Sequence, residues 1–402
     1  MDRLGNVAVS AIPIVFGEPR FWVALALLPV GFCIKIDGRP RKMTSCMFGV
    51  TGALAVTFLL YMFISSLWSV GVGTVYSSFI VYKAYETGML LVVVLATVSV
   101  CRDADPVELQ KGLWTGILAF CFLLAAAGII GYGSGRRLAV FGGGPNVFGR
   151  NMALMCIGCL MAANAKGKYI LWLILCSIGG ALIILSGSRG ALLSAVLSVG
   201  STFFLMRVKW HRKIFIGICG LLLSAIILQY TPIGLRTMDV FRSRVINLTF
   251  EQEHTSGRSE LLEQAIKIGS EHMYVGVGLG GYIYVTGSNY PHNLFLEAFS
   301  EGGSIGLALL VGTIGIFVIN SWRDRKLIDP FLAGAFILFF IASQFSGSLF
   351  DSRSVFIFLI LASIPGKQRW ESQMWKRPLF PFVVSKHSGY RKNRMMMLRR
   401  PL

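Results

Sequence analysis

The chain has 402 residues, of which 54% are hydrophobic and 14% are charged, and its formal net charge is +19. Soluble globular proteins carry about a quarter of their residues as charged side chains, so this composition excludes an ordinary soluble enzyme and indicates an integral membrane protein. We attribute the positive charge to membrane topology and expect no nucleic-acid partner, although the basic tail can contact anionic lipid.

Apolar segments recur along most of the chain, each close to the ~20 residues that cross a lipid bilayer. They predict an all-α, polytopic membrane helix bundle of about twelve transmembrane helices with one long, partly helical loop over residues 230–291. We expect residues 1–366 to form this membrane domain and residues 367–402 to form a basic cytoplasmic tail. The predicted spans are 7–17, 20–36, 46–66, 80–101, 113–131, 147–164, 169–186, 188–206, 213–230, 300–320, 331–347 and 353–364.

The basic residues between the spans predict the orientation. With a cytoplasmic N-terminus, most of the 38 lysines and arginines fall on the cytoplasmic side, as the positive-inside rule requires. An even number of spans returns the C-terminus to that side. The basic residues left on the outer face are almost all arginine: Arg20, Lys83, Arg136, Arg137, Arg150, Arg189, Arg236, Arg242, Arg244, Arg258, Lys267 and Arg353.

The arginine bias on the outer face indicates anion binding. A guanidinium group stays charged and binds phosphate through two parallel hydrogen bonds. The alternative is ion pairing with loop acids such as Asp239 and Glu260, and for the arginines of the loop both interpretations stay open. Arg189 has no acid near it in the sequence, which favours a ligand-binding role there.

Two glycine-rich outer turns lie next to these arginines. Gly142-Gly143-Gly144-Pro145-Asn146 precedes a predicted span and is flanked by Arg136, Arg137 and Arg150; it suits close backbone approach to a ligand, or is an ordinary loop. Ser186-Gly187-Ser188-Arg189-Gly190 places Arg189 at a predicted helix N-terminus, where the helix dipole and the guanidinium group favour the same anion. The alternative is a hairpin turn with a snorkelling arginine.

The long loop has two recognisable segments. Thr255–Ile266 combines a Ser/Thr start, early acids and apolar residues at helical spacing, which predicts an amphipathic helix with Arg258 at its beginning. Val275–Tyr282 faintly resembles a dinucleotide-binding glycine loop, but no strand–helix unit surrounds it. We expect it to be a flexible apolar segment lying on the membrane.

His292 stands where the loop meets the next apolar helix. A titratable imidazole at such a junction is well placed to move a proton, and the alternative is a helix cap. No two histidines or acids stand at metal-ligand spacing on one predicted helix face, so no metal site is predicted.

Several outer motifs occur in the order typical of one family. They are Ser66-Leu67-Trp68-Ser69, Gly144-Pro145-Asn146, Ser186-Gly187-Ser188-Arg189-Gly190, Gly257-Arg258, Val275-Gly276-Val277-Gly278, and His292-Asn293 followed after nine residues by Gly303-Ser304-Ile305-Gly306. In this order they resemble the O-antigen ligase and polymerase superfamily of bacterial envelope glycan enzymes, over roughly residues 60–320. The chain departs from the family at Lys83, where an arginine was expected.

The resemblance implies a multi-pass glycosyltransferase of the bacterial inner membrane. Its donor would be a glycan on undecaprenyl diphosphate, transferred to an acceptor hydroxyl at the periplasmic face in one inverting displacement, without metal or other cofactor. Arg189 and Arg258 would neutralise the diphosphate, and His292 would serve the acceptor hydroxyl. The further substrate-binding candidates are Arg136, Arg137, Asn146, Arg150 and Asn293.

The shared motifs leave the acceptor open. The intact His-Asn motif and the compact loop favour an O-antigen ligase, which transfers the glycan to lipid A core in lipopolysaccharide biosynthesis. The alternatives are an O-antigen or exopolysaccharide polymerase, whose acceptor is the growing glycan, a protein O-oligosaccharyltransferase, and a flippase of lipid-linked glycans. A transporter would carry polar residues in mid-membrane and often internal repeats, whereas the charges here gather on the outer face.

Overall fold

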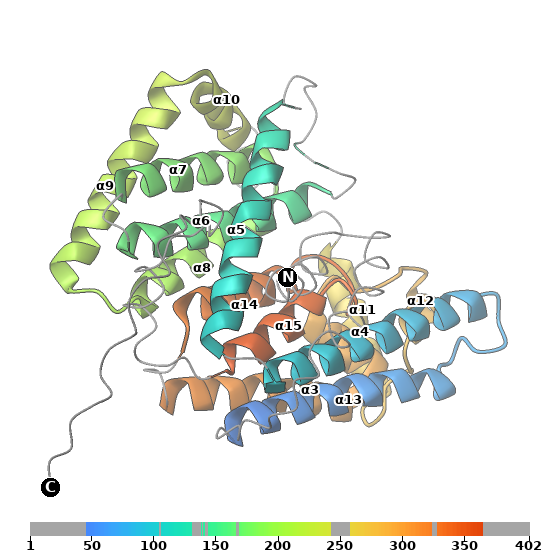
Figure 1. Ribbon diagram of the computed structural model, residues 1–402. Coiled ribbons are helices and arrows are strands. Elements are labelled where there is room, and N and C mark those ends of the chain that lie inside the picture. The colour runs from blue at the N-terminus through green and yellow to red at the C-terminus, as the bar shows by residue number, and fades with distance from the viewer. Residues whose placement is uncertain are drawn as a thin grey trace, which may run out of the picture.

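The computed structural model describes residues 46–103, 106–130, 138, 140, 144–165, 169–242, 258–323 and 328–364, and every regular element within them is a helix (Figure 1). The all-α prediction is therefore confirmed. In chain order the helices are α3 (Cys46–Ile64), the 3-10 helix η1 (Ser65–Trp68), α4 (Ser77–Asp103), α5 (Pro106–Ile130), α6 (Pro145–Ala165), α7 (Tyr169–Leu185), α8 (Arg189–Leu205), α9 (Trp210–Tyr230), α10 (Pro232–Val240), α11 (Arg258–Glu271), α12 (Gly281–Thr286), α13 (Leu294–Arg323), α14 (Pro330–Ala342) and α15 (Arg353–Ala362).

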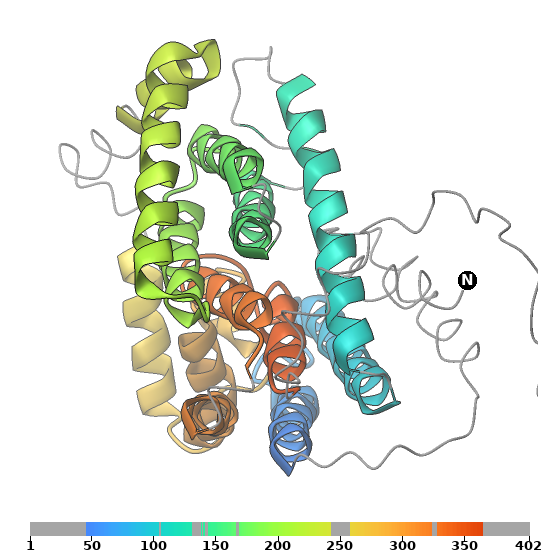
Figure 2. The ribbon, with the colours of Figure 1, turned by 60° about the vertical axis from the view of Figure 1, so that its left-hand side comes forward.

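The helices form two groups that are joined by α14 and α15. In one group α3 packs between α4 and α13; in the other α6 packs against α7 and α8. Helix α14 contacts α6 and α8, and α15 contacts α3 and α4, so this helix pair links the two groups (Figure 1). Figure 2 shows α5 and α9 standing upright on opposite sides of the second group.

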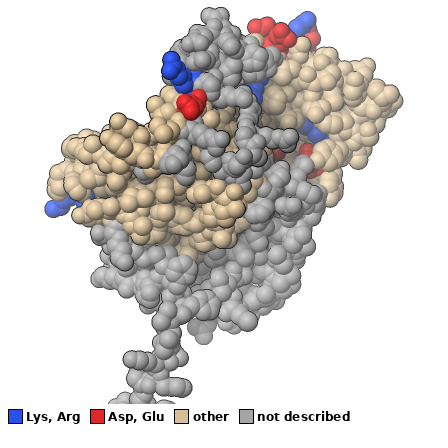
Figure 3. Space-filling view, turned by 90° about the horizontal axis from the view of Figure 1, so that it is seen from above, with Lys and Arg blue, Asp and Glu red and all other residues tan. Residues whose placement is uncertain are grey.

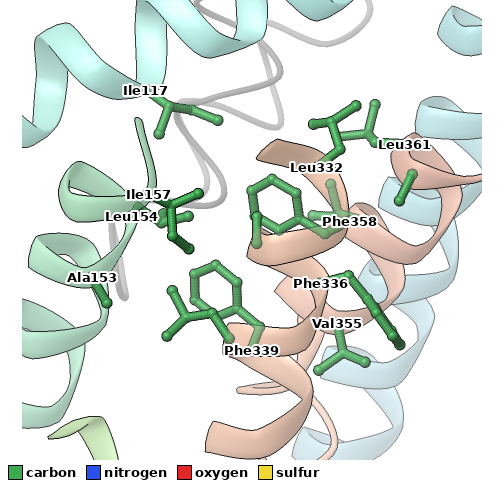
Figure 4. Close-up of a cluster of buried hydrophobic side chains, with 14 of the residues drawn as sticks. Ile117, Ala153, Leu154, Ile157, Leu332, Phe336, Phe339, Val355, Phe358 and Leu361 are labelled. Atoms are coloured by element: carbon green, nitrogen blue, oxygen red, sulfur yellow. The ribbon is translucent and has the colours of Figure 1, made fainter. Parts of the chain in front are cut away.

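Aromatic side chains fill the core between the two groups (Figure 4). Phe339 of α14 stacks on Phe358 of α15 with ring centroids 5.4 Å apart. Ile157 of α6 and Ile117 of α5 are fully buried in the same cluster. Helices in a membrane associate mainly through such close packing, because lipid tails are as apolar as the side chains themselves.

Six helices of the described part are long and apolar enough to cross a membrane: α4, α9 and α13, the segment from Gly49 to Trp68, most of α5 and most of α6. Four further apolar helices, α7, α8, α14 and α15, are shorter. Figure 3 shows charged side chains at only a few places on the described surface of one face. The predicted count of twelve spans is not confirmed, and the predicted spans 7–17 and 20–36 lie outside the described residues.

The predicted span 331–347 extends five residues beyond its helix. Helix α14 ends at Ala342 and α15 begins at Arg353, so residues 343–352 form a non-helical connection that we call the α14–α15 loop. A hydrogen bond within the loop stabilises its turn: the backbone N–H of Ser348 donates to Asp351 Oδ2 at 2.9 Å. Gly347, directly before it, has a φ of 95°. Such local hydrogen bonds compete with helical ones, which is why the helix stops.

Helix α13 starts earlier than predicted and is broken near its beginning. Gly303 has φ 64° and ψ −164°, a conformation that is essentially restricted to glycine. The segment from Met273 to Gly278 supplies the hydrogen bonds lost at the break. Val277 N–H donates to the Ser300 carbonyl at 3.0 Å and Gly278 N–H to the Glu301 carbonyl at 2.9 Å. On the far side of the break, Ser304 N–H donates to the Met273 carbonyl at 2.7 Å.

Residues 275–282 were predicted to lie on the membrane, and this prediction was wrong. Residues 276–283 are buried rather than spread on the membrane, and Leu279 is fully inaccessible. The glycines are required for fit. A side chain on Gly276, which has a φ of 67°, would come within 2.5 Å of the Glu301 carbonyl carbon. The glycine repeat therefore lets this segment enter the gap in α13.

The break in α13 gives a direct test of this packing. Gly303→Ala should destabilise the protein by about 1–3 kcal/mol for the backbone conformation alone, with a further loss because the new methyl group would meet the Tyr274 carbonyl. Gly312→Ala is the matched control, since the same helix leaves open space there and alanine favours a helix. Thermal unfolding in detergent measures both, and equal midpoints for the two variants would contradict the broken-helix geometry.

Candidate active site

A cavity of about 150 Å³ opens where three of the predicted arginine segments meet. Three guanidinium groups line it, those of Arg150, Arg189 and Arg258, together with the amide of Asn146. None of the lining residues is acidic. The full lining is Asn146, Arg150, Gly187, Ser188, Arg189, Gly190, Ala191, Arg258, Ala342, Phe345 and Ser346.

Three helices present their N-terminal ends to this cavity. Asn146 and Arg150 lie in the first two turns of α6, Arg189 is the first residue of α8, and Arg258 is the first residue of α11. A helix N-terminus carries roughly half a positive charge and unsatisfied N–H donors. Helix dipoles and guanidinium groups thus have the same sign at one place, which is the electrostatics of an anion site.

Hydrogen bonds between side chains hold the first turns of α6 and α8 together. Ser188 caps α8 by accepting from the Ala191 N–H at 3.2 Å, and its hydroxyl donates to Asn146 Oδ1 at 2.5 Å. Asn146 Nδ2 in turn donates to Ser346 Oγ of the α14–α15 loop at 3.1 Å. A side chain at Gly149 would approach Ala191 Cβ within 2.8 Å, so glycine is needed where the two helices meet.

The arginines are oriented by backbone carbonyls. Arg258 Nη1 donates to the Phe345 carbonyl at 2.7 Å, and Arg150 Nη2 donates to the Ala342 carbonyl at 3.3 Å. Both acceptors belong to the end of α14 and the loop after it. Neutral acceptors fix these two guanidinium groups without cancelling their charge, so that charge is retained for a ligand.

His292 adjoins the cavity in an unusual backbone conformation. It is the one non-glycine residue with positive φ in the described part of the chain, at 61°. The Tyr290 ring meets the imidazole edge-on at 4.7 Å between centroids. The imidazole Nδ1 is buried and has no hydrogen-bond partner among the described residues. Strained backbone and unsatisfied buried polar atoms both concentrate at functional sites.

The cap of α13 is Asn293 and not His292. Asn293 Oδ1 accepts from the Leu296 N–H at 3.1 Å, and its Nδ2 lies 3.5 Å from the Gln344 carbonyl. The Leu294 N–H donates to the Ser343 carbonyl at 3.2 Å. The α14–α15 loop therefore accepts hydrogen bonds both from Arg258 and from the start of α13. These contacts place His292 beside the arginine cavity.

The surroundings of His292 favour its neutral form. Burial lowers the pKa of His292 below its ordinary value, and the positive charge of Arg258 lowers that pKa further. The carboxylate of Asp351 acts in the opposite direction and raises it. The net effect is a lowered pKa, so the imidazole is mainly unprotonated at neutral pH and is able to accept a proton.

The structure brings together most of the predicted site residues. Four of them, Asn146, Arg150, Arg189 and Arg258, line one cavity, and His292 and Asn293 lie next to it. Arg136 and Arg137 lie outside the described residues. Among the described residues no group of three or more His, Cys, Asp and Glu side chains is arranged to hold a metal ion.

Sequence reasoning missed the first half of the α14–α15 loop, since residues 343–347 were counted as membrane span, and it assigned no role to the second half. Phe345 and Ser346 of this loop line the cavity, and Asp351 is the acid that acts on His292. A polar signal was present, because Ser343-Gln344-Phe345-Ser346-Gly347-Ser348 interrupts the apolar run.

In the described part of the chain, apolar helices carry an arginine-lined cavity beside a histidine, an arrangement whose chemistry suits the binding of an anionic group. Residues 170–311 match the family model described as O-Antigen ligase. The match confirms the resemblance to the O-antigen ligase and polymerase superfamily and supports membrane glycan transfer of that type. A search of the curated proteins found no significant match.

The matched range covers only part of the site. It includes Arg189, Arg258 and His292, whereas Asn146, Arg150 and the α14–α15 loop lie outside it. The cavity therefore joins residues inside the matched range to residues outside it.

The opposing charges around His292 predict two changes in its titration. Asp351→Asn should lower the pKa of His292 further, and Arg258→Gln should raise it toward the ordinary value, because each removes one charge that acts on the imidazole. Glu263→Gln, which removes an exposed acid of α11, should leave it unchanged. NMR titration of isotope-labelled histidine measures these pKa values, with the resonance assigned by its loss in a His292 variant. Identical titration curves for the Asp351 variant and the wild type would rule out this coupling.

Proposed function

We propose that the protein transfers a glycan from undecaprenyl diphosphate to an acceptor hydroxyl at the periplasmic face of the bacterial inner membrane. The observation that carries this proposal is the cavity that joins Arg150, Arg189 and Arg258 to three helix N-termini, next to a neutral His292. The O-antigen ligase match over residues 170–311 supports the class of reaction.

The arginine cavity is suited to the diphosphate of the donor. When the bond between the anomeric carbon and the phosphate oxygen breaks, its electron pair goes to the diphosphate and adds negative charge there. Fixed guanidinium groups and helix dipoles stabilise that charge without having to reorganise during the reaction. Arg189 and Arg258 are the residues that we assign to this task, and Arg150 and Asn146 complete the wall.

His292 is suited to the acceptor. A sugar hydroxyl is a weak nucleophile, and a positioned general base typically speeds its attack by ~10²–10⁴-fold. In the proposed step the acceptor oxygen bonds to the anomeric carbon while its proton moves to the imidazole. The bond to the diphosphate breaks on the opposite side of that carbon. One displacement of this kind inverts the anomeric centre and needs no covalent intermediate.

For the acceptor we favour lipid A core, which would make the protein an O-antigen ligase of lipopolysaccharide biosynthesis. The intact His292-Asn293 motif supports this choice. An O-antigen or exopolysaccharide polymerase uses the same donor and is the second candidate, followed by a protein O-oligosaccharyltransferase. A flippase fits less well, because the arginine cavity lies at helix ends and not in the middle of the spans.

Arg189→Lys tests the phosphate role while keeping the charge. The substitution removes the planar fork that binds two phosphate oxygens at once. Loss of one charge-assisted hydrogen bond should weaken donor binding roughly ten-fold or more. Arg212→Lys, an exposed arginine in the first turn of α9, is the matched control and should bind the donor normally. Equal donor affinity in both variants would mean that Arg189 has only a structural role.

His292→Ala separates chemistry from donor binding. Turnover should fall by ~10²–10⁴-fold, as expected for loss of a general base, while the affinity for the lipid-diphosphate glycan stays within a few-fold. His272→Ala removes an exposed histidine of the same loop and should keep full turnover. Release of undecaprenyl diphosphate by the purified protein measures the rate. Near-normal turnover in the His292 variant would remove it from the mechanism.

The acceptor is identified by competition between substrates. Purified protein receives the lipid-linked glycan with lipid A core in one reaction and with further lipid-linked repeat units in another. A ligase glycosylates lipid A core and leaves the repeat units at their original length. Elongated lipid-linked glycan with unmodified lipid A core would identify a polymerase instead.

A further inference from the structure

Three charged side chains form a buried cluster between α4 and α13, which we call the Lys83 cluster. Lys83 Nζ lies 2.7 Å from Glu297 Oε1, 2.9 Å from Glu301 Oε1 and 3.1 Å from Glu301 Oε2. All three side chains are at most 5% exposed. Both helices pack on α3 (Figure 1), so the cluster is enclosed by protein.

The cluster uses the whole hydrogen-bonding capacity of Lys83. An ammonium group has three N–H donors, and three carboxylate oxygens lie within hydrogen-bond distance of Nζ. The fourth carboxylate oxygen, Glu297 Oε2, is buried and has no partner among the described residues. All N–H donors of Lys83 are thus used by two carboxylates. Lys83 stands at the position where the family resemblance led us to expect an arginine.

The two glutamates belong to the short half-helix of α13, which begins at Leu294, two residues after His292, and ends at the break at Gly303. Glu297 N–H donates to the Asn293 carbonyl at 2.9 Å, within the first turn of α13. The Glu301 carbonyl accepts from the Gly278 N–H at 2.9 Å, directly before the break at Gly303. The half-helix is therefore attached at one end to the glycine segment and along its side to α4 through Lys83.

Lys83 and the histidine segment come from parts of the chain that the family match separates. The match covers residues 170–311 and thus includes both glutamates and His292, but it excludes α4. A buried ion pair is favourable only when its geometry is good and its hydrogen bonds are made, and removing one partner leaves a buried charge uncompensated. Such a contact resists sliding or rotation of the half-helix, which apolar packing against α3 would allow.

We propose that the Lys83 cluster positions His292, and that Lys83 holds the half-helix in place instead of binding phosphate. This inference rests on the proposed function. Lys83, Glu297 and Glu301 are positioning residues, since they act on the acceptor step through the direction of the half-helix. A displacement of about 1 Å at a reacting group reduces turnover by ~10²-fold, whereas the arginine cavity, built on α6, α8 and α11, should keep its donor affinity.

Lys83→Met is the primary test, carried out on the full chain in detergent. We expect turnover to fall by ~10²-fold with the dissociation constant for the lipid-diphosphate glycan changed less than about three-fold. Lys83→Arg, which keeps the charge, should recover a large part of the rate. Lys267→Met is the matched control, because it removes a lysine whose pair with Glu271 is exposed and 3.9 Å long.

Two results would overturn the proposal. Wild-type turnover in Lys83→Met would show that the cluster does not position His292. A loss of donor affinity as large as the loss of turnover would make Lys83 a phosphate ligand. Glu301→Gln keeps the volume of the side chain and provides a second route if Lys83→Met does not fold. It should reduce turnover more than Glu297→Gln does, since Glu301 holds Lys83 with both oxygens, and full turnover in both variants would contradict the proposal.

A measurement without substrate separates this proposal from the proposed function. The NMR resonance of His292 should shift in Lys83→Met and stay in place in Lys267→Met, whatever reaction the protein catalyses. If the wild type transfers no glycan but the resonance shifts, only the proposed function fails. An unchanged resonance together with normal transfer by the wild type would remove the positioning role alone.

Discussion

The rest of this structure depends on one constraint: the backbone hydrogen bonds lost at the break in α13 must be made by another segment of the protein. A bilayer offers no water to backbone polar groups, so each N–H and carbonyl released by a break must be satisfied by protein. The segment from Met273 to Gly278 does this for α13, donating to the carbonyls of Ser300 and Glu301 and accepting from Ser304. The break separates the short half-helix that begins after His292 from the long apolar part. The direction of the half-helix is consequently set by its own contacts.

The basic residues expected on the outer face have two distinct uses. Arg150, Arg189 and Arg258 line a cavity without an acid and are held by neutral carbonyl groups or lie at helix N-termini. Lys83 is enclosed with two glutamates. Desolvation explains the countercharges at Lys83, because a buried charge needs one. Arg189 and Arg258 at the cavity are only partly buried, so their charges remain in contact with solvent. The planar guanidinium fork of arginine suits an open anion site, and the compact ammonium group of lysine suits a buried position between two carboxylates.

The all-helical fold followed from the sequence, because apolar run length is a local signal. The sequence also singled out Arg189 and Arg258, which line one cavity in the structure; their role there belongs to the proposed function. The pairing of Lys83 with Glu297 and Glu301 was not predictable, because it joins residues more than 200 positions apart. The first half of the α14–α15 loop was missed for a different reason: residues 343–347 directly follow a long apolar run and were assigned to the same span. The glycine segment at 275–278 was expected to lie flexibly on the membrane, because the sequence does not reveal that the backbone of Glu301 packs against it.

The lining of the arginine cavity has a consequence for the range of donors. The cavity has a volume of about 150 Å³, and its lining carries three arginines and no acid. It is therefore suited to the phosphate groups of the proposed donor. If the proposed donor binds there, the cavity contacts the diphosphate, which all lipid-linked diphosphate donors share. Selectivity for the glycan would then depend on surfaces beyond the arginines.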